Sequence, residues 1–226
     1  MIVSSSKVAQ KLIEQTLREL SQPQQPKARS RVWQDPKGCQ YLAVWQNAAL
    51  LRVLVRKFTI TLPLDKTLNQ PLEYRLKAQL DDAARSVKRN IEEGWKRPTT
   101  SEYLQFLGYS QASLEEVKGD IRDCKTDGFL ESQPESSLGD LGFNINIFKG
   151  AGKGMAKGEP TEISHPYCQP LERLKGTDLT YEIFMELVNK TDWLLRLLVQ
   201  SLEKKLTKDQ KTYQIERMRV KSNLKL

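Results

Sequence analysis

Four stretches of the chain place apolar side chains at alternating steps of three and four residues, the spacing that forms a continuous apolar face on an α-helix. The stretches cover residues 41–62, 71–93, 99–130 and 178–206. Helices of this kind are stable only when their apolar faces are buried against one another. Because only a few residues separate the second stretch from the third, these two helices are expected to be antiparallel neighbours. The sequence therefore predicts an all-α fold, an antiparallel up-down four-helix bundle.

The predicted inward positions share this helical spacing within each stretch. They are Tyr41, Val44, Ala48, Leu51, Val55, Phe58 and Leu62, then Leu76, Leu80, Ala83, Val87 and Ile91, then Leu107, Leu114, Val117 and Ile121, and last Phe184, Leu187, Leu194, Leu198 and Leu202. Residues 193–199 are apolar around most of the helix circumference, more than one core face requires. This surplus predicts contact either with another subunit or with an additional N-terminal helix.

Residues with strong positional preferences predict where the middle helices begin and end. Gly94 is expected to adopt the left-handed conformation that closes the second helix, and Pro98 prevents the helix from continuing. Thr99 and Glu102 have the spacing of a capping box at the start of the third helix. Gly128 is expected to end that helix.

Segments outside the four stretches divide the chain further. Residues 1–36 combine an extra N-terminal helix, expected over residues 6–20, with a polar, proline-bearing linker. The bundle itself is expected over residues 37–206. Residues 207–226 are polar and basic, and they predict a tail or a weak helix.

A long insertion is expected before the last helix. Residues 131–176 are rich in glycine and lysine, and glycine disfavours any element longer than a short strand such as residues 143–148. The segment is therefore predicted to be a partly mobile insertion. The last helix is expected to begin with Thr177 or Asp178 as its capping residue.

The charge of the chain favours an anionic partner. Lysine and arginine total 36 against 28 aspartates and glutamates, which gives a formal net charge of +8 and a pI near 9.3. A surface of this average charge attracts anions, nucleic acid above all. An excess of this size also serves solubility, so composition alone leaves both interpretations open.

The chain shows no sign of membrane insertion or export. No apolar run approaches the roughly 18 residues that a membrane span requires, and the first residues lack the order of regions of a signal peptide. The expected location is the cytoplasm. Cys39, Cys124 and Cys168 are an odd number at wide spacing, so they are predicted to be reduced and structural rather than disulfide-bonded or zinc-binding.

Several motifs resemble a known family over roughly residues 40 to 130. They are Tyr41-Leu42-Ala43-Val44-Trp45-Gln46, Ala84-Arg85-Ser86-Val87-Lys88-Arg89-Asn90-Ile91-Glu92-Glu93-Gly94, Arg97, Glu102-Tyr103-Leu104-Gln105-Phe106-Leu107 and Ala112-Ser113-Leu114-Glu115-Glu116. The chain resembles the four-helix-bundle family that contains the proteins encoded in bacterial ribosomal RNA intervening sequences and the accessory variability determinant of diversity-generating retroelements. Glu92 stands where members commonly carry alanine.

This resemblance implies a fold and a function. Members are barrel-like homopentamers of four-helix subunits, and their basic surface binds nucleic acid. In the retroelement branch they also bind the reverse transcriptase and template RNA. They have no established catalytic activity, so the resemblance implies a binding protein rather than an enzyme.

A stripe of basic residues on the second helix is the predicted nucleic-acid interface. Arg85, Lys88 and Arg89 fall at i, i+3 and i+4, so they share one side of the helix. The full predicted set is Lys77, Arg85, Lys88, Arg89, Lys96 and Arg97. Such a row can neutralise phosphates and make binding salt-dependent. The alternative is a solvated face held by ion pairs, with Asp81 bonded to Arg85 and Glu92 to Lys96.

Two further groups of residues are candidates for nucleic-acid contact. Trp45, Trp95 and Trp193 could stack on unpaired bases, although tryptophans in bundles are more often core or interface anchors. Flexible basic arms commonly add non-specific affinity for nucleic acid, and the alternative is that they only make the protein more soluble. The arm residues are Lys149, Lys153 and Lys157 in the insertion and Lys204, Lys205, Lys208, Lys211, Arg217, Arg219, Lys221 and Lys225 in the tail.

The sequence offers little for catalysis, and no cofactor or metal is predicted. His165 is the only histidine, so no triad with a second base can form within one chain. Residues 150–154 lack the first glycine and the hydroxyl residue of a phosphate-binding loop. The leading hypothesis is a homo-oligomeric accessory protein that binds RNA or DNA for a reverse transcriptase. The alternative is a helical scaffold that binds a protein partner without nucleic acid.

Overall fold

The structure, a computed structural model, describes residues 35–62, 71–143 and 168–223, and every regular element in these residues is helical. In chain order the elements are the 3₁₀ turn η1 (Gly38–Tyr41), α3 (Ala43–Thr61), α4 (Pro71–Trp95), α5 (Thr100–Thr126), α6 (Cys168–Arg173), the 3₁₀ turn η3 (Gly176–Asp178) and α7 (Tyr181–Asn223). The prediction of an all-α chain is therefore confirmed for the described residues.

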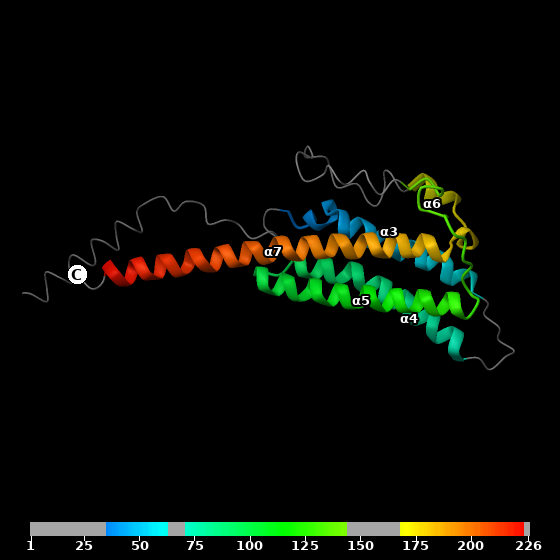
Figure 1. The fold of residues 1–226 in the computed structure, drawn as a ribbon, viewed down its shortest axis with the longest axis horizontal. Helices are drawn as coiled ribbons and strands as arrows, with labels where there is room; N and C mark the ends of the chain where they lie inside the picture. The colour runs from blue at the N-terminus through cyan, green and yellow to red at the C-terminus, as the bar shows by residue number, and fades with distance from the viewer. Residues whose placement is uncertain (1–34, 63–70, 144–167, 224–226) are drawn as a thin grey trace, which may run out of the picture.

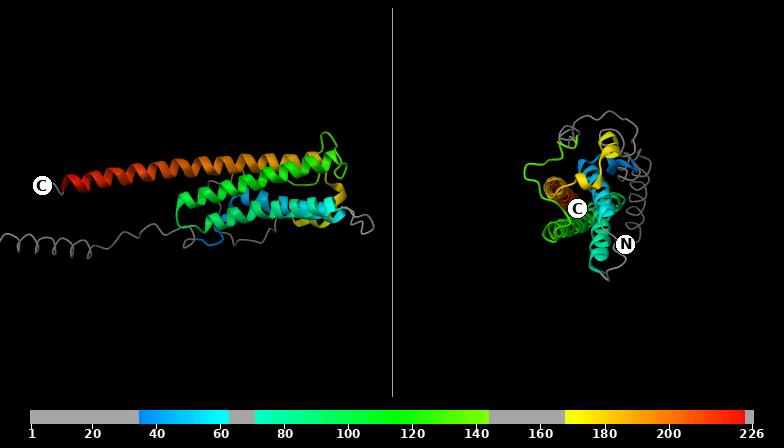
Figure 2. Two further views of the ribbon diagram at one scale, coloured as in Figure 1. Left: turned by 90° about the horizontal axis from the view of Figure 1, so that it is seen from below. Right: turned by 90° about the vertical axis from the view of Figure 1, so that its right-hand side faces the viewer.

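The four long helices α3, α4, α5 and α7 lie side by side around one core (Figures 1 and 2). The most extensive contact joins α4 and α5, and α5 also packs on α7. Helix α3 completes the ring because it packs on both α4 and α7. Each long helix therefore has two long neighbours, and α7 alone continues far beyond the others (Figure 1).

The predicted inward positions form the core of this ring. All are buried except Tyr41, Leu76, Leu194, Leu198 and Leu202, which are half-buried. Phe58 of α3 meets Phe184 of α7 edge to face with ring centroids 5.7 Å apart. The apolar spacing in the sequence thus identifies correctly which side of each long helix faces its neighbours.

The prediction that Gly94 adopts the left-handed conformation and closes the second long helix is wrong. Helix α4 continues through Gly94 to Trp95, and Gly94 is not among the described residues with positive φ. A β-carbon at Gly94 would lie 2.6 Å from Cδ2 of Tyr103 and 2.8 Å from Cβ of Phe106. Glycine is required here because α5 packs directly on the α4 backbone.

Both predicted ends of the third long helix are confirmed. The Thr99 hydroxyl accepts the Glu102 backbone N–H at 3.1 Å, and the Glu102 carboxylate accepts the Thr99 N–H at 3.2 Å. The Thr99 hydroxyl also donates to the Glu102 carboxylate at 2.7 Å, and this bond, together with the one from the Thr99 N–H, lowers the pKa of Glu102. At the other end Gly128 has a φ of 78°, and the Phe129 N–H donates to the Cys124 carbonyl at 2.9 Å.

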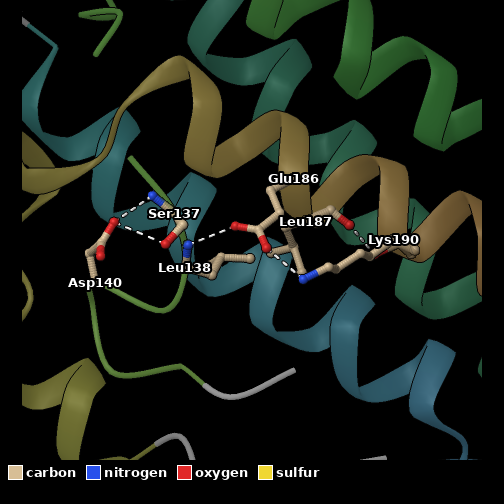
Figure 3. Close-up of polar contacts among 7 residues, drawn as sticks. Ser137, Leu138, Asp140, Glu186, Leu187 and Lys190 are labelled. Atoms are coloured by element: carbon tan, nitrogen blue, oxygen red, sulfur yellow. Dashed lines mark hydrogen bonds and ion pairs between the residues drawn. The ribbon is translucent and has the colours of Figure 1, made fainter. Parts of the chain in front are cut away.

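Residues 131–143 pack on the first turns of α7 instead of forming a structureless insertion (Figure 3). Leu138 is fully buried, and its backbone N–H donates to the Glu186 carboxylate at 2.7 Å. Glu186 also forms an ion pair with Lys190 one turn further along. Asp140 closes the local turn by accepting the Ser137 N–H at 2.8 Å. The start of α7 is therefore anchored by the segment that leaves α5.

The segment immediately before α7 is also more regular than predicted. Helix α6 and turn η3 precede α7, in a region expected to hold nothing longer than a short strand. A β-carbon at Gly176 would lie 2.2 Å from the Lys57 carbonyl oxygen, so η3 lies directly on the α3 backbone. The close approach to α3, which glycine alone permits, positions the chain for entry into α7.

Helix α7 begins and ends later than the sequence suggests. Its cap is Thr180, whose hydroxyl accepts the Ile183 N–H at 3.4 Å. The predicted caps Thr177 and Asp178 both belong to η3. At the other end α7 continues past Leu206 to Asn223. The described part of the expected basic tail is therefore a continuation of the last helix.

Several expectations concern residues that the structure does not describe. They are the N-terminal helix at residues 6–20, its linker up to residue 34, the possible strand beyond Phe143, the lysines Lys149, Lys153 and Lys157, Lys225, and His165. Within the described residues no helix is long and apolar enough to cross a membrane.

The two described cysteine side chains are free and buried in the core. They are Cys39 and Cys124. Burial disfavours the thiolate and raises the pKa of Cys39 to about 11 and that of Cys124 to about 12. Nearby carboxylates, Glu92 for Cys39 and Asp120 for Cys124, act in the same direction. Both thiols are therefore unreactive packing groups at neutral pH.

Replacing Gly94 with alanine is expected to lower the free energy of unfolding by about 2 kcal/mol, because the added methyl group must displace α5. Gly108 is a matched control on α5, where a β-carbon meets nothing within 4 Å. Gly108→Ala is expected to raise stability by about 0.5–1 kcal/mol through helix propensity. Urea denaturation of both variants checks the pair, and a stabilising Gly94→Ala would contradict the close approach of the two helices.

Asp120 introduces a pH dependence into the packing of α5 on α4. Asp120 is 5 % exposed. Its Oδ1 accepts from Gln79 Nε2 at 3.2 Å, and its Oδ2 has no hydrogen-bond partner among the described residues. Burial, with the neighbouring charges of Glu116 and Asp123, raises the pKa of Asp120 to about 6. Because the folded pKa exceeds the unfolded one, the folded state loses stability as the pH rises from about 4 to above 6.

The substitution Asp120→Asn is expected to remove this loss. Above pH 7 the variant should be more stable than the wild type by about 2 kcal/mol, and below pH 4 the two should converge. Unfolding free energies measured from pH 4 to pH 8 test the sign of the effect. A constant difference across that range would show that Asp120 is not the titrating group.

Candidate nucleic-acid interface

Helices α3 and α4 border a depression of about 430 Å³ that is lined by four cationic side chains. Its lining residues are Arg52, Val53, Arg56 and Lys57 from α3 and Asp81, Asp82 and Arg85 from α4. Four cationic side chains therefore surround two carboxylates. This α3–α4 groove is the candidate interface, since its net charge is positive and its cations come from two helices.

The local helix geometry explains why these side chains meet. Arg52 and Arg56 are one turn apart on the outer side of α3, away from the core positions such as Leu51. Asp82 and Arg85 are similarly one turn apart on the outer side of α4. Because α3 packs on α4, the two outward rows face the same groove.

Ion pairs hold part of the groove in place. Arg56 Nη1 lies 3.0 Å from Asp81 Oδ2 and joins the two helices. Arg85 Nη2 lies 3.2 Å from Asp82 Oδ1 within α4. The two pairs differ from the predicted bond between Asp81 and Arg85, because α3 brings Arg56 closer to Asp81.

The remaining cations of the groove have different roles. Lys57 Nζ donates to the Leu174 carbonyl at 2.9 Å, so it fixes the segment before η3 to α3. Arg52 is exposed and forms no ion pair within the described residues. Half of the Arg85 side-chain surface is also exposed. Arg52, which has no ion pair in the described residues, is therefore the cation of the groove best placed to bind an external anion. Arg85 and Arg56 are paired with carboxylates but remain accessible, with 50 % and 61 % of their side chains exposed.

The predicted stripe on α4 is divided between the surface and the contact with α3. Arg85 and Arg89 are exposed. Lys88 instead lies in the contact, with 19 % of its side chain exposed. Its Nζ lies 2.8 Å from Glu92 Oε1 and 5.1 Å from the centroid of the Trp45 ring. The structure therefore separates Lys88 from the two arginines with which it was grouped.

Glu92 connects α4 to α3 through two partners. Its Oε1 accepts the Trp45 indole N–H at 3.0 Å and pairs with Lys88. The predicted pair of Glu92 with Lys96 is replaced by this arrangement. A carboxylate at this position thus satisfies the indole N–H of a tryptophan that is only 6 % exposed.

The other predicted residues lie elsewhere on α4 or beyond it. Lys77 is half-buried near the start of α4. Lys96 and Arg97 are exposed in the turn between α4 and α5, and the Arg97 guanidinium lies 4.4 Å from the centroid of the Phe106 ring. These three do not line the α3–α4 groove. As nucleic-acid ligands all six residues stay predictions.

The three candidate tryptophans have different environments. Trp45 is buried, and Trp95 is half-buried with its indole N–H donating to the Asp35 carbonyl at 3.0 Å. Trp193 of α7 is 54 % exposed. Only Trp193 among these three has a ring accessible enough to stack on a base or a partner.

Arg52, Arg56 and Lys57 are missing from the sequence-based site. The signal was present, because Arg52 and Arg56 stand at i and i+4 opposite the apolar face of α3. Their importance becomes visible only when the pairing of α3 with α4 is known. Periodicity describes each helix separately and does not say which outer faces adjoin.

The fold and the groove define a class of helical protein with an arginine-lined depression between two long helices. The model of one family, described as 23S rRNA-intervening sequence protein, matches residues 40–141. The matched segment contains α3, α4, α5 and the turns that follow, and all seven lining residues of the groove lie within it. No curated protein and no solved structure matches the chain.

The described residues contain no group of three or more histidine, cysteine, aspartate or glutamate side chains placed to hold a metal ion. The acidic pairs of α4 and α5 project from neighbouring positions of one helix and engage local cations where a partner is present, as Asp82 does with Arg85. The side chains that the candidate interface offers are three arginines and one lysine, with two carboxylates between them.

Replacing Lys88 with glutamine is expected to lower the free energy of unfolding by about 1 kcal/mol, because the ion pair with Glu92 and the contact with Trp45 are lost. Its affinity for nucleic acid should stay within about twofold of the wild type. Arg85→Gln is the comparison, and it should change affinity while leaving stability within about 0.5 kcal/mol. A strong loss of nucleic-acid affinity in Lys88→Gln would show that Lys88 belongs to the binding interface.

Proposed function

We propose that this protein is a non-catalytic nucleic-acid-binding accessory protein that contacts the phosphate backbone through the α3–α4 groove. The observation that carries the proposal is the grouping of Arg52, Arg56, Lys57 and Arg85 around one depression with two carboxylates. Arginine binds phosphate oxygens through paired N–H donors, and such contacts position nucleic acid without reading its sequence. Support also comes from the match to a family named for ribosomal RNA intervening sequences.

We infer that α3, α4, α5 and α7 form an up-down bundle in which helices consecutive in the chain run antiparallel. The short turn between α4 and α5, which share the most extensive contact, supports this arrangement. In such a bundle the groove is a rigid surface, because both of its walls are packed on the core. Rigid placement of Arg52 and Arg85 lowers the entropy lost on binding.

The partner and assembly proposed here follow from the family resemblance. The bound nucleic acid would be template RNA or its cDNA, held for the reverse transcriptase of a diversity-generating retroelement. The active form would be a homo-oligomer, a pentamer by the same resemblance, acting in the cytoplasm. Several copies would place several grooves along one strand and strengthen binding through multivalency.

Neutralising Arg52 and Arg85 of the groove, together with the exposed Arg89 one turn beyond Arg85 on α4, tests the proposal. The variant Arg52→Gln, Arg85→Gln, Arg89→Gln is expected to bind fluorescent single-stranded RNA and duplex DNA at least about tenfold more weakly at 0.1 M salt. The slope of log affinity against log salt should fall by about 2 to 3. Circular dichroism and solution mass should stay unchanged, because none of the three residues belongs to the core.

A control with the same charge change separates the groove from net charge. Arg122, Arg173 and Arg196 are exposed and lie outside the groove. Their replacement by glutamine should reduce affinity by less than about threefold, since none of the three lines the groove and salt screens exposed charges. Equal losses in the two variants would show that only the total charge matters.

A protein scaffold is the second candidate function. Trp193 and Leu197 are exposed one turn apart on α7, with 54 % and 43 % of their surfaces accessible, and they form an apolar contact site. If the wild type ignored both RNA and DNA at low salt, the scaffold would replace the nucleic-acid interpretation. Steeply salt-dependent binding would support the accessory protein.

A further inference from the structure

Helix α7 extends as a single helix beyond the ring of four (Figures 1 and 2). The last half-buried position is Leu206, and every side chain described from Thr207 to Arg219 is exposed. From Leu206 to Asn223 the axis advances about 25 Å at 1.5 Å per residue. We call residues 204–223 the arm.

Three lysines share one side of the arm with the exposed Ile215, while Lys205 and Arg217 lie on other sides. Lys204, Lys208 and Lys211 fall within a sector of about 60° at 100° per residue, and all three are exposed. We call these three residues the arm stripe. The nearby carboxylates, Glu203, Asp209 and Glu216, lie outside that sector by about 80° or more. A helix whose charges served only solubility would mix the two signs around its circumference.

The opposite side of the arm has a different character. The core positions of α7 continue there as Leu206, Asp209, Tyr213 and Glu216, so apolar and acidic residues alternate. Pairing with the α7 helix of a second copy along this side would bury carboxylates, whether the two helices ran parallel or antiparallel. The carboxylates would face either each other or apolar groups, and both arrangements are unfavourable. A sector with three lysines and no carboxylate therefore favours a polyanion on the arm stripe over a second α7 on the opposite side.

We propose that the arm binds the phosphate backbone of duplex nucleic acid through the arm stripe, as a second contact site separate from the α3–α4 groove. This inference rests on the proposed function. The cations of the stripe are spaced about 6 Å and 4.5 Å along the helix axis. A duplex carries one phosphate per 3.4 Å of axis on each strand. The lysine spacings are between one and two times this distance, so each lysine can contact a different phosphate.

The shape of the arm favours a duplex over a single strand. A straight helix fits along a groove of a duplex, where its cations reach the flanking phosphates. Binders of single strands stack bases on aromatic platforms. Tyr213 is the only aromatic residue between Lys204 and Asn223, and it lies on the opposite side from the arm stripe. The arm stripe thus provides phosphate contacts and no stacking surface.

The test compares two neutralised variants of the same helix. Lys208→Gln with Lys211→Gln removes two cations of the arm stripe, and Lys205→Gln with Arg217→Gln removes two cations from other sides of the arm. The net charge is equal, and glutamine preserves helix propensity. Affinities for duplex RNA, duplex DNA and a single strand of the same length are measured across a salt series with the full chain.

The stripe variant is expected to bind duplexes about tenfold more weakly, with the salt slope reduced by nearly 2, while the control stays within about threefold of the wild type. Loss confined to duplex RNA or to duplex DNA would identify the form of duplex that the arm prefers. Equal effects of the two variants, or a loss confined to the single strand, would overturn the arm proposal while leaving the groove intact. A wild type without any affinity would overturn both.

Discussion

Burial of α3 is the constraint on which the rest of the structure depends. Leu50, Leu51 and Leu54 have no exposed surface, because α4, α7 and η3 all pack on this helix. Removing any of these neighbours would expose several large apolar side chains, each worth about 2 kcal/mol when buried. The close approaches at Gly176 and Gly94 follow from the same requirement, since the elements must come together without voids to enclose the core.

Packing on α3 also decides which charges remain available. Lys88 and Glu92 are drawn into the contact by Trp45, whose indole N–H needs an acceptor once the ring is buried. Arg52 and Arg85 lie further along the same pair of helices, where solvent reaches the groove. One helix contact therefore contains both a structural polar cluster and a cationic surface. The difference between them is access to water, which charge and spacing in the sequence do not reveal.

Much of the fold could be predicted, and less of the candidate site. The core face of each long helix and the capping box at Thr99 follow from local patterns that act within a few residues. The roles of Gly94 and Gly176 could not be predicted, because each depends on how closely another helix approaches in space. The same reason explains why Arg52 was missed and why Lys88 was grouped with Arg85.

The sequence by itself determined the helical class, the apolar faces and the basic balance of the chain, because helix formation and net charge depend on residue type and short-range spacing. Tertiary structure decided that residues 131–143 pack on α7 through Leu138 and that α3 supplies three of the four cations of the groove. It also decided that α7 continues as one helix past its last half-buried residue. These features depend on which surfaces adjoin in space, and adjacency arises only when all four long helices share one core.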